Sequence, residues 1–200
     1  MRSGLNKIQR CPGCGDFLII AAIKSAFREL GIESHNRVVV SGVGCSGKAS
    51  QYIDGYAAET LHGRTLPFAT GVKMANPELT VMAVGGDGDG YGIGMGHFIH
   101  SCRRDMDITY LVFNNENYAL TTGQASPTTP VGAKTKTTPE GNITTPLNPI
   151  ELAKIAGARF AKRVDGSNLA LLKETIKDAI NHKGFALVDI IQACPSFKRW

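Results

Sequence analysis

Short apolar runs alternate with amphipathic segments along most of the chain. Runs rich in Val, Ile and Leu are typical of buried parallel strands, and apolar positions that recur every three to four residues predict helices. These patterns predict strands at residues 37–41, 79–84, 108–113, 158–164 and 185–190. They predict helices at residues 16–30, 66–75, 91–104, 149–155 and 169–181, with Asp16 as the N-cap of the first helix and Gly31 at its end. Strands that alternate with helices predict an α/β fold, a single domain over residues 1–200 with a mostly parallel sheet flanked by helices.

Residues 121–149 interrupt this alternation. The segment is rich in Thr and Pro and shows neither a helical nor a strand period. A loop of this length in a compact domain is usually a functional lid or binding loop, or else it is disordered. The sequence alone leaves both interpretations open.

Composition and charge narrow the class of protein. The 200 residues are 42% hydrophobic, enough for one core, and no apolar run is long enough to span a membrane. The N-terminal segment lacks the apolar stretch of a secretory signal, so we expect a cytoplasmic protein whose thiols stay reduced. The net charge is +5, and residues 151–200 hold nine basic and five acidic side chains. This excess of positive charge indicates either a solvated surface or a docking face for an acidic partner. The sequence has no basic clusters interleaved with aromatic residues, so we expect no nucleic-acid binding.

Polar and glycine-rich segments follow three of the predicted strands, at residues 42–48, 85–90 and 114–118. Ligands of parallel α/β sheets bind at the carboxyl ends of the strands, so we expect a site where these segments meet. In GDGDG, residues 86–90, the glycines allow the backbone to approach a ligand closely, but the two carboxylates would repel a phosphate. A Mg²⁺ ion resolves this conflict, because it takes one or two protein oxygens and bridges to phosphate oxygens. The Asn114-Asn115 pair would supply the second oxygen donor.

Four of the five cysteines occupy positions that a parallel sheet can bring together. Cys11 and Cys14 have CxxC spacing, Cys45 follows the first predicted strand, and Cys194 follows the last. The CxxC pair alone is compatible with a structural zinc, a redox dithiol or half of a cluster site. Four converging thiols favour a site of four cysteines that holds either zinc or a 4Fe–4S cluster. Cys102 lies in a predicted helix, and we interpret it as a small buried hydrophobic residue.

These motifs together resemble a known family. Gly86-Asp87-Gly88 followed by Asn114-Asn115 is similar to the thiamine diphosphate signature. The segments CPGCGD, SGVGCSGK, GDGDGYGIGMGHFIHSCRRDMDI and VFNNENYALTTGQASPTT resemble, in the same order, the β subunit of 2-oxoacid:ferredoxin oxidoreductases. The resemblance covers essentially the whole chain and implies a thiamine diphosphate-binding fold.

The resemblance also implies cofactors and the residues that hold them. The expected cofactors are thiamine diphosphate, Mg²⁺ and one 4Fe–4S cluster. It assigns Mg²⁺ to Asp87, Asn115 and the carbonyl of Asn117, and the cluster to Cys11, Cys14, Cys45 and Cys194. It assigns thiamine diphosphate contacts to Val43, Gly44, Cys45, Ser46, His62, Gly88, Asp89, Ala119 and Leu120. It makes Lys48 and His62 catalytic contacts to substrate or cofactor, where a surface lysine and a structural histidine are the alternatives.

The implied function is the catalytic β subunit of a ferredoxin-dependent 2-oxoacid oxidoreductase. This activity is the CoA-dependent oxidative decarboxylation of a 2-oxoacid to acyl-CoA and CO₂, with electrons passed through the cluster to ferredoxin. The implied partners are ferredoxin, coenzyme A, the 2-oxoacid and an α (or fused α–γ) subunit whose glutamate activates the thiamine. One alternative is a thiamine diphosphate-dependent non-oxidative decarboxylase or synthase whose four cysteines hold zinc. Another is a non-catalytic zinc interaction module.

Overall fold

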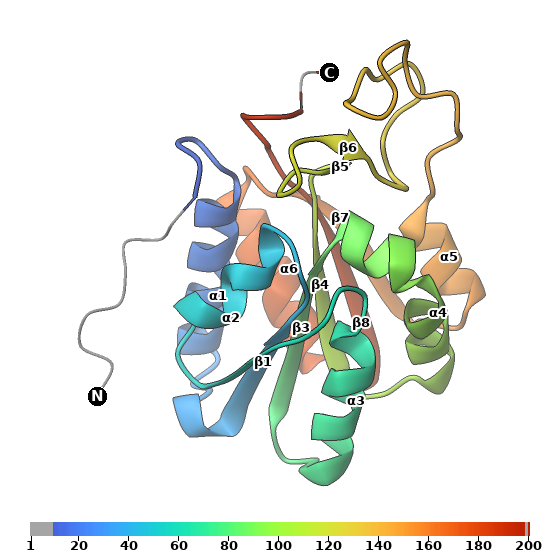
Figure 1. Cartoon of the computed structure of the whole chain (residues 1–200). Helices are drawn as coiled ribbons and strands as arrows, with labels where there is room; N and C mark the ends of the chain where they lie inside the picture. The colour runs from blue at the N-terminus through green and yellow to red at the C-terminus, as the bar shows by residue number, and fades with distance from the viewer. Residues whose placement is uncertain (1–9, 199) are drawn as a thin grey trace.

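A computed structural model describes residues 10–198 and residue 200. Residues 1–9, in which we read no secretory signal, lie outside the described residues. Among the helices of the described part, none has the length and apolar character needed to cross a membrane. The described chain forms an α/β fold with one large sheet between layers of helices (Figure 1).

The large sheet has six parallel strands in the order β2-β1-β3-β4-β8-β7. The strands are β1 (Arg37–Ser41), β2 (Tyr56–Glu59), β3 (Thr80–Gly86), β4 (Ile108–Asn114), β7 (Phe160–Asp165) and β8 (Phe185–Ile191). The predicted parallel sheet and its five predicted strands are confirmed. The sequence patterns missed β2, which lies at one edge of the sheet and leaves most of its residues exposed.

Helices cover both faces of this sheet and create two cores (Figure 1). One face is covered by α1 (Asp16–Glu29), α2 (Ala49–Tyr52) and α6 (Leu169–Asn181). The other face is covered by α3 (Thr65–Ala75), α4 (Met95–Arg104) and α5 (Pro149–Ile155). Because side chains of a strand alternate between faces, Val39 packs in the first core while Val38 and Val40 pack in the second.

Two local expectations are wrong. Gly15, not Asp16, is the N-cap of α1, and Asp16 is a helical residue whose side chain is fully buried. The helix expected from residue 91 starts later, because Gly88–Ile93 forms a single wide helical turn, η3, before α4 begins at Met95. Gly92 has non-helical angles, φ −89° and ψ −107°, which separate the two elements. The end of α1 is confirmed, with Gly31 in the left-handed region at φ 64°.

The segment of residues 121–149 is a folded loop over the carboxyl edge of the sheet (Figure 1). Its first residues include β6 (Gln124–Ala125), which pairs with β5 (Asn117–Tyr118) in a two-stranded antiparallel ribbon. Farther along, Asn142 Nδ2 donates to Thr129 O at 2.8 Å and Leu147 N donates to Pro127 O at 2.9 Å. Of the two interpretations, disorder is therefore wrong.

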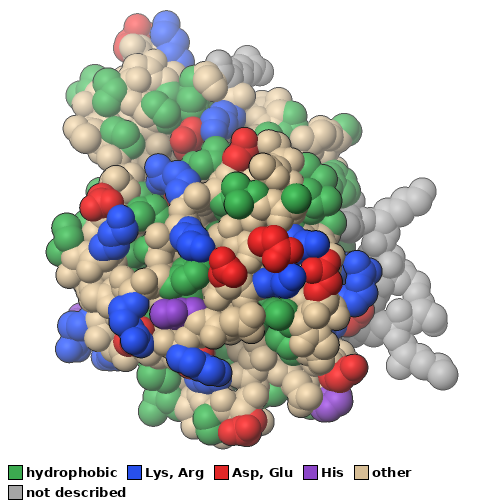
Figure 2. Space-filling model, turned by 180° about the vertical axis from the view of Figure 1, so that it is seen from behind, with side chains coloured by type: hydrophobic (Ala, Val, Ile, Leu, Met, Phe, Trp, Pro, Cys, Tyr) green, Lys and Arg blue, Asp and Glu red, His purple; other side chains and the backbone are tan. Residues whose placement is uncertain are grey.

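The excess of basic residues in the last quarter of the sequence is spread over ion pairs. Lys173 and Lys177 both pair with Glu29, and Lys162 pairs with Asp178. On the face shown in Figure 2, acidic and basic side chains lie next to one another across the middle of the surface. This distribution favours a solvated surface over a docking face of one charge.

The remaining short elements lie around the strand ends. They are η1 (Ser34–Asn36) and η2 (Ser46–Lys48). The second of these follows β1 and carries the SGK part of the SGVGCSGK motif. It therefore lies at the edge where ligands of parallel sheets bind.

Candidate functional site

A cavity of about 190 Å³ opens where β1, β3 and β4 end. Its lining includes all nine residues assigned to thiamine diphosphate contacts and all three assigned to Mg²⁺. These residues come from positions 43–46, 62, 87–89, 115, 117 and 119–120, so the fold brings together segments that are far apart in the sequence. Their individual roles stay predictions.

The structure separates Lys48 from this set. Lys48 ends η2 and is half-buried, and it does not line the cavity formed by the described residues. Its predicted contact with substrate or cofactor therefore gains no support from the geometry of this chain.

His62 lines the cavity and is not a buried structural histidine. Its Nδ1 lies 3.1 Å from Asp89 Oδ1 and 3.2 Å from the carbonyl oxygen of Val43. Both neighbours are hydrogen-bond acceptors, so Nδ1 carries a hydrogen. About a third of the side chain is exposed, 36%.

Asp89 holds the segments around the cavity in place. Its carboxylate accepts hydrogen bonds from Gly63 N at 2.8 Å and Val43 N at 3.2 Å, and from the hydroxyl of Thr65 at 3.3 Å. Burial raises the pKa of Asp89, and these backbone donors partly offset that shift. Although Asp89 lines the cavity, its oxygens are engaged by the protein, which makes it an organiser of the site.

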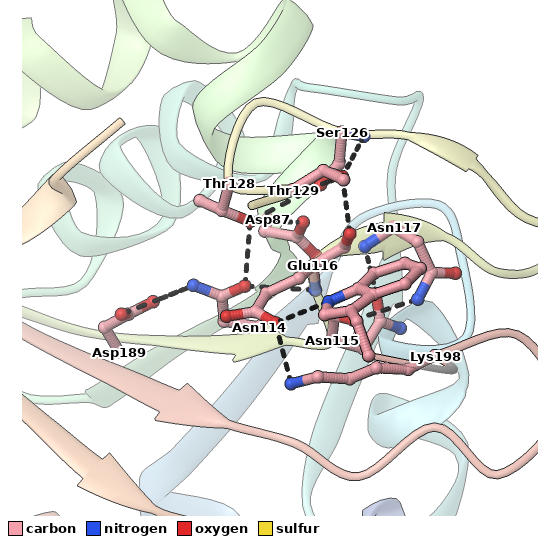
Figure 3. Close-up of polar contacts among 11 residues, drawn as sticks. Asp87, Asn114, Asn115, Glu116, Asn117, Ser126, Thr128, Thr129, Asp189 and Lys198 are labelled. Atoms are coloured by element: carbon pink, nitrogen blue, oxygen red, sulfur yellow. Dashed lines mark hydrogen bonds and ion pairs between the residues drawn. The ribbon is translucent and has the colours of Figure 1, made fainter. Parts of the chain in front are cut away.

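Asp87 is the buried carboxylate at the centre of the site. It is 1% exposed, and burial raises its pKa from 3.8 to about 6. The hydroxyl of Thr128 lies 2.8 Å from Asp87 Oδ2 and 2.9 Å from Asn114 Oδ1 (Figure 3). A hydroxyl has a single hydrogen, so it can donate fully to only one of these two acceptors at a time. Thr128 therefore links the ends of β3 and β4 to the long loop.

Asn114 belongs to a buried network that continues to Asp189 (Figure 3). Asn114 Nδ2 donates to Asp189 Oδ1 at 3.1 Å, and the Tyr91 hydroxyl donates to the same oxygen at 3.0 Å. Arg163 Nε lies 2.7 Å from Asp189 Oδ2. Burial raises the pKa of Asp189, and the Arg163 charge opposes that shift. Since Asn114 is committed to this network and Asn115 lines the cavity, the geometry favours Asn115 as the metal ligand of the pair.

Sequence reasoning missed Thr128 and Asp189. A signal for Asp189 was present, because a carboxylate in the middle of the apolar run FALVDII must find partners when the strand is buried. Thr128 carried no such signal, since one threonine of a threonine-rich loop is indistinguishable from its neighbours in sequence.

The turn from Asn115 to Asn117 carries oxygens that fit a metal ion or a polar ligand. Asn115 Oδ1 accepts from Asn117 N at 3.1 Å, and Asn117 Nδ2 donates to the Asn115 carbonyl at 2.9 Å. Within the described part of the chain, the buried atoms Asn117 Oδ1 and Ser46 Oγ have no hydrogen-bond partner. A buried polar atom without a partner is costly, so both atoms are suited to a bound group. Asp87 and the amide oxygens of Asn115 and Asn117 together form the kind of oxygen donor set that Mg²⁺ prefers.

Glu116, between these two asparagines, anchors the turn. It lies in the left-handed region at φ 61°, which is unfavourable for a residue with a Cβ. Lys198 Nζ lies 2.8 Å from Glu116 Oε2, and the Thr129 hydroxyl donates to the Glu116 carbonyl at 2.6 Å (Figure 3). The C-terminal segment and the long loop thus both hold the turn.

The four cysteines assigned to the cluster lie in one region beside the cavity. Gly15 N donates to Ala193 O at 3.1 Å, which places the CPGCG segment next to Cys194. Burial, followed by the charge of Asp16, raises the pKa of Cys14 to about 12. Burial and then Asp16 raise the pKa of Cys45 to about 11, with smaller effects from Cys194 and Cys11. Cys45 belongs to both groups, because it also lines the cavity.

Two further observations concern metal binding and the fifth cysteine. Although these cysteines lie in one region, no three His, Cys, Asp or Glu side chains within residues 10–198 and 200 stand together as ligands for a metal ion, so the assignment of four cysteines to a cluster stays a prediction. Cys102 is fully buried in the second core, so its interpretation as a small hydrophobic residue is confirmed.

Comparisons with known proteins identify the family. Residues 41–190 match the thiamine pyrophosphate enzyme family, in its C-terminal TPP binding domain. The chain is 45% identical over 189 residues to 2-oxoglutarate synthase subunit KorB of Archaeoglobus fulgidus, covering 94% of this chain and 70% of that protein. It is 50% identical over 189 residues to 2-oxoacid:ferredoxin oxidoreductase subunit beta of Saccharolobus solfataricus. The chain belongs to the family of 2-oxoacid:ferredoxin oxidoreductase β subunits. The resemblance drawn from the motifs is therefore confirmed.

The match to this family extends over 94% of the chain but only 62% of the length of the Saccharolobus subunit. A solved structure, 2-oxoglutarate:ferredoxin oxidoreductase from Magnetococcus marinus, is 40% identical with a TM-score of 0.95. It covers 97% of this chain and 67% of that chain, and it contains 2-oxoglutarate, coenzyme A and succinyl-CoA. The thiamine diphosphate-binding fold expected for a member of this family is confirmed.

Proposed function

We propose that the chain is the catalytic β subunit of a ferredoxin-dependent 2-oxoacid oxidoreductase. Its reaction would convert a 2-oxoacid and coenzyme A to acyl-CoA and CO₂ and pass two electrons, one at a time, through a 4Fe–4S cluster to ferredoxin. The observation that most directly supports this proposal is the position of Cys45. It lines the cavity of a thiamine-family fold and lies within electrostatic reach of three other cysteines. A thiamine site with an electron acceptor beside it is suited to oxidation rather than to simple decarboxylation.

The chain's own residues would hold and orient the reacting groups. Asp87, Asn115 and Asn117 would hold Mg²⁺ against the diphosphate, and Asp89 would fix the orientation of His62 at the cavity. Thiamine diphosphate, when bound, supplies the electron sink for the charge left by loss of CO₂. The four cysteines would supply the thiolate ligands of the cluster.

The proposed partners follow from the family. Relatives are named as β subunits, which supports an α (or fused α–γ) subunit that completes the active site with a glutamate. The Magnetococcus protein contains coenzyme A and 2-oxoglutarate, which supports coenzyme A and a 2-oxoacid as substrates here. Ferredoxin as the electron acceptor and the cytoplasm as the location complete the proposal.

Anaerobic purification tests the cluster. The chain should carry iron and acid-labile sulfide and show a broad visible absorption that dithionite bleaches. A colourless protein with stoichiometric zinc would contradict the proposal and favour the non-oxidative decarboxylase or synthase.

Substitution of Asp87 tests the metal site. Loss of a residue that only hydrogen-bonds to a metal ligand typically lowers metal affinity by about 10–100-fold. Asp87→Ala removes a proposed ligand itself and should therefore weaken Mg²⁺-dependent binding of thiamine diphosphate by more than about 100-fold. Calorimetric titration with and without Mg²⁺ measures the effect. Asp178→Ala, which removes an exposed carboxylate of α6, should bind like the wild type. Affinity retained in Asp87→Ala would remove Asp87 from the site.

A further inference from the structure

A buried ion pair flanks the CPGCG segment, and neither the cavity nor the Mg²⁺ site uses it. Arg10 Nε lies 2.7 Å from Asp16 Oδ2, and the side chains are 4% and 0% exposed. Arg10 directly precedes the segment and Asp16 directly follows it. Arginine and aspartate are seldom fully buried, and burying both is unfavourable unless their hydrogen-bonding groups are satisfied.

The described residues do not satisfy every hydrogen-bonding group of this pair. Arg10 Nη2 and Asp16 Oδ1 are buried without a hydrogen-bond partner among the residues that the structure describes. The Arg10 guanidinium also lies over the ring of Tyr52, with 5.7 Å between Cζ and the ring centroid. This contact fixes the guanidinium from the α2 side. A buried N–H without an acceptor points to a group that residues 10–198 and 200 do not provide.

Both charges act on the thiols. Asp16 raises the pKa of Cys14 and of Cys45, and Arg10 lowers both, in each case after the larger effect of burial. The pair therefore lies within electrostatic reach of one thiol of the CxxC pair and of the thiol at the cavity. A negatively charged centre held by these sulfurs would meet a cation and an anion whose effects oppose each other.

We propose that Arg10 and Asp16 set the reduction potential of the four-cysteine centre. This inference rests on the proposed function, because it requires an iron–sulfur cluster on these thiols. When an electron released by oxidation of the 2-oxoacid enters the cluster, the cluster gains one negative charge and no bond forms or breaks. The electron then leaves to ferredoxin and the charge returns to its former value. The positive charge of Arg10 would stabilise the reduced state of the cluster, and the negative charge of Asp16 would stabilise the oxidised state.

Opposite substitutions should move the midpoint potential in opposite directions. Arg10→Gln should shift it to more negative values, and Asp16→Asn should shift it to more positive values. Arg10→Lys keeps the charge and should stay closer to the wild type than Arg10→Gln does. Lys73→Gln is the matched control, because it breaks an ion pair of 3.0 Å with Asp107, which directly precedes β4 at the amino end of that strand. Each potential is measured by anaerobic redox titration followed by visible absorption and electron paramagnetic resonance.

The outcomes separate this inference from the proposed function. Shifts of opposite sign in Arg10→Gln and Asp16→Asn, with Lys73→Gln unchanged, would support it. Variants with a full cluster and an unchanged potential would overturn it and leave the proposed function intact. A wild-type chain without a cluster would overturn both. If Arg10→Gln does not assemble the cluster, the Arg10→Lys variant decides the test. A cluster in Arg10→Lys with a midpoint potential near that of the wild type would support the role of the charge. A midpoint potential far from that of the wild type, or no cluster in Arg10→Lys, would overturn the inference. If only Asp16→Asn does not assemble the cluster, the shift of the midpoint potential in Arg10→Gln decides the test.

Discussion

At the scale of single residues, the space around two glycines determines how closely the backbone approaches the cavity. A Cβ at Gly88 would lie 2.1 Å from Tyr118 Cε1, and a Cβ at Gly42 would lie 2.2 Å from Asp89 Oδ2. Both neighbours line the cavity. Any larger residue must therefore displace a side chain on which the shape of the site depends.

Gly88→Ala should destabilise the protein and weaken binding of thiamine diphosphate. The added methyl group must move the Tyr118 ring, and overpacking of this kind costs about 1–3 kcal/mol. Urea denaturation gives the free energy of unfolding, and calorimetry gives the affinity. Gly71→Ala in α3 is the matched control, because a Cβ there meets nothing within 4 Å of the described chain. It should raise stability by up to about 1 kcal/mol, since alanine is the better helix former. Equal effects of the two substitutions would contradict the role of Gly88.

At the scale of elements, the long loop is joined to two strand ends through Thr128. The hydroxyl reaches Asp87 after β3 and Asn114 at the end of β4, and both acceptors are buried. The loop therefore contributes directly to the geometry of the proposed metal site, although it supplies none of the predicted ligands.

Thr128→Val should lower stability by about 1–3 kcal/mol, because the change keeps the shape but leaves a buried acceptor without its donor. It should also weaken Mg²⁺ binding. Thr175→Val is the control, because Thr175 is buried to a similar extent. Its hydroxyl donates to the Leu171 carbonyl within α6, and that carbonyl also accepts a backbone hydrogen bond of the helix. Denaturation and metal titration of both variants measure the difference. A Thr128→Val protein as stable as Thr175→Val would show that the loop does not support the site.

The elements also show what the sequence could predict. The four internal strands, β1, β3, β4 and β8, were predictable because their apolar runs are buried, whereas β2 was missed because it is mostly exposed at one edge of the sheet. The strand at the opposite edge, β7, was predicted although most of its residues are not buried. The motif residues of the site were predictable because strand ends in parallel sheets meet at one edge. Contacts that depend on the fold could not be predicted in this way. Asp16 resembles a helix cap in sequence, and only the structure shows that its side chain is buried against Arg10. The same is true of Thr128, 41 residues from Asp87.

At the scale of the whole molecule, ion pairs tie the first helix to the last. Lys173 Nζ and Lys177 Nζ of α6 lie 2.8 Å and 3.1 Å from the two carboxylate oxygens of Glu29 in α1. The hydrogen bonds from Lys173 and Lys177 lower the pKa of Glu29 from 4.5 to about 2. Since the folded state holds the ionised form more tightly, this contribution is present above pH 4.5 and is lost as the pH falls towards 2.

Glu29→Gln should therefore be less stable than the wild type at neutral pH, with a gap that closes as the pH falls from 4.5 to 2. The free energy of unfolding, measured by urea denaturation at a series of pH values, gives the gap. Glu140→Gln, which removes an exposed carboxylate that forms no ion pair within the described residues, is the control for the substitution itself. A pH-independent gap for Glu29→Gln would show that the ion pairs add nothing to stability.

The hydrogen bond between Gly15 and Ala193 has a consequence for the order of events during synthesis. Cys11 and Cys14 are translated before β8, the strand that brings Cys194 to them. Domains fold as units once their sequence has emerged. The CxxC pair therefore has no access to Cys194 until β8 has been translated. Assembly of the proposed four-thiol group would therefore require pairing of β8 into the sheet, and not only translation of the CxxC segment.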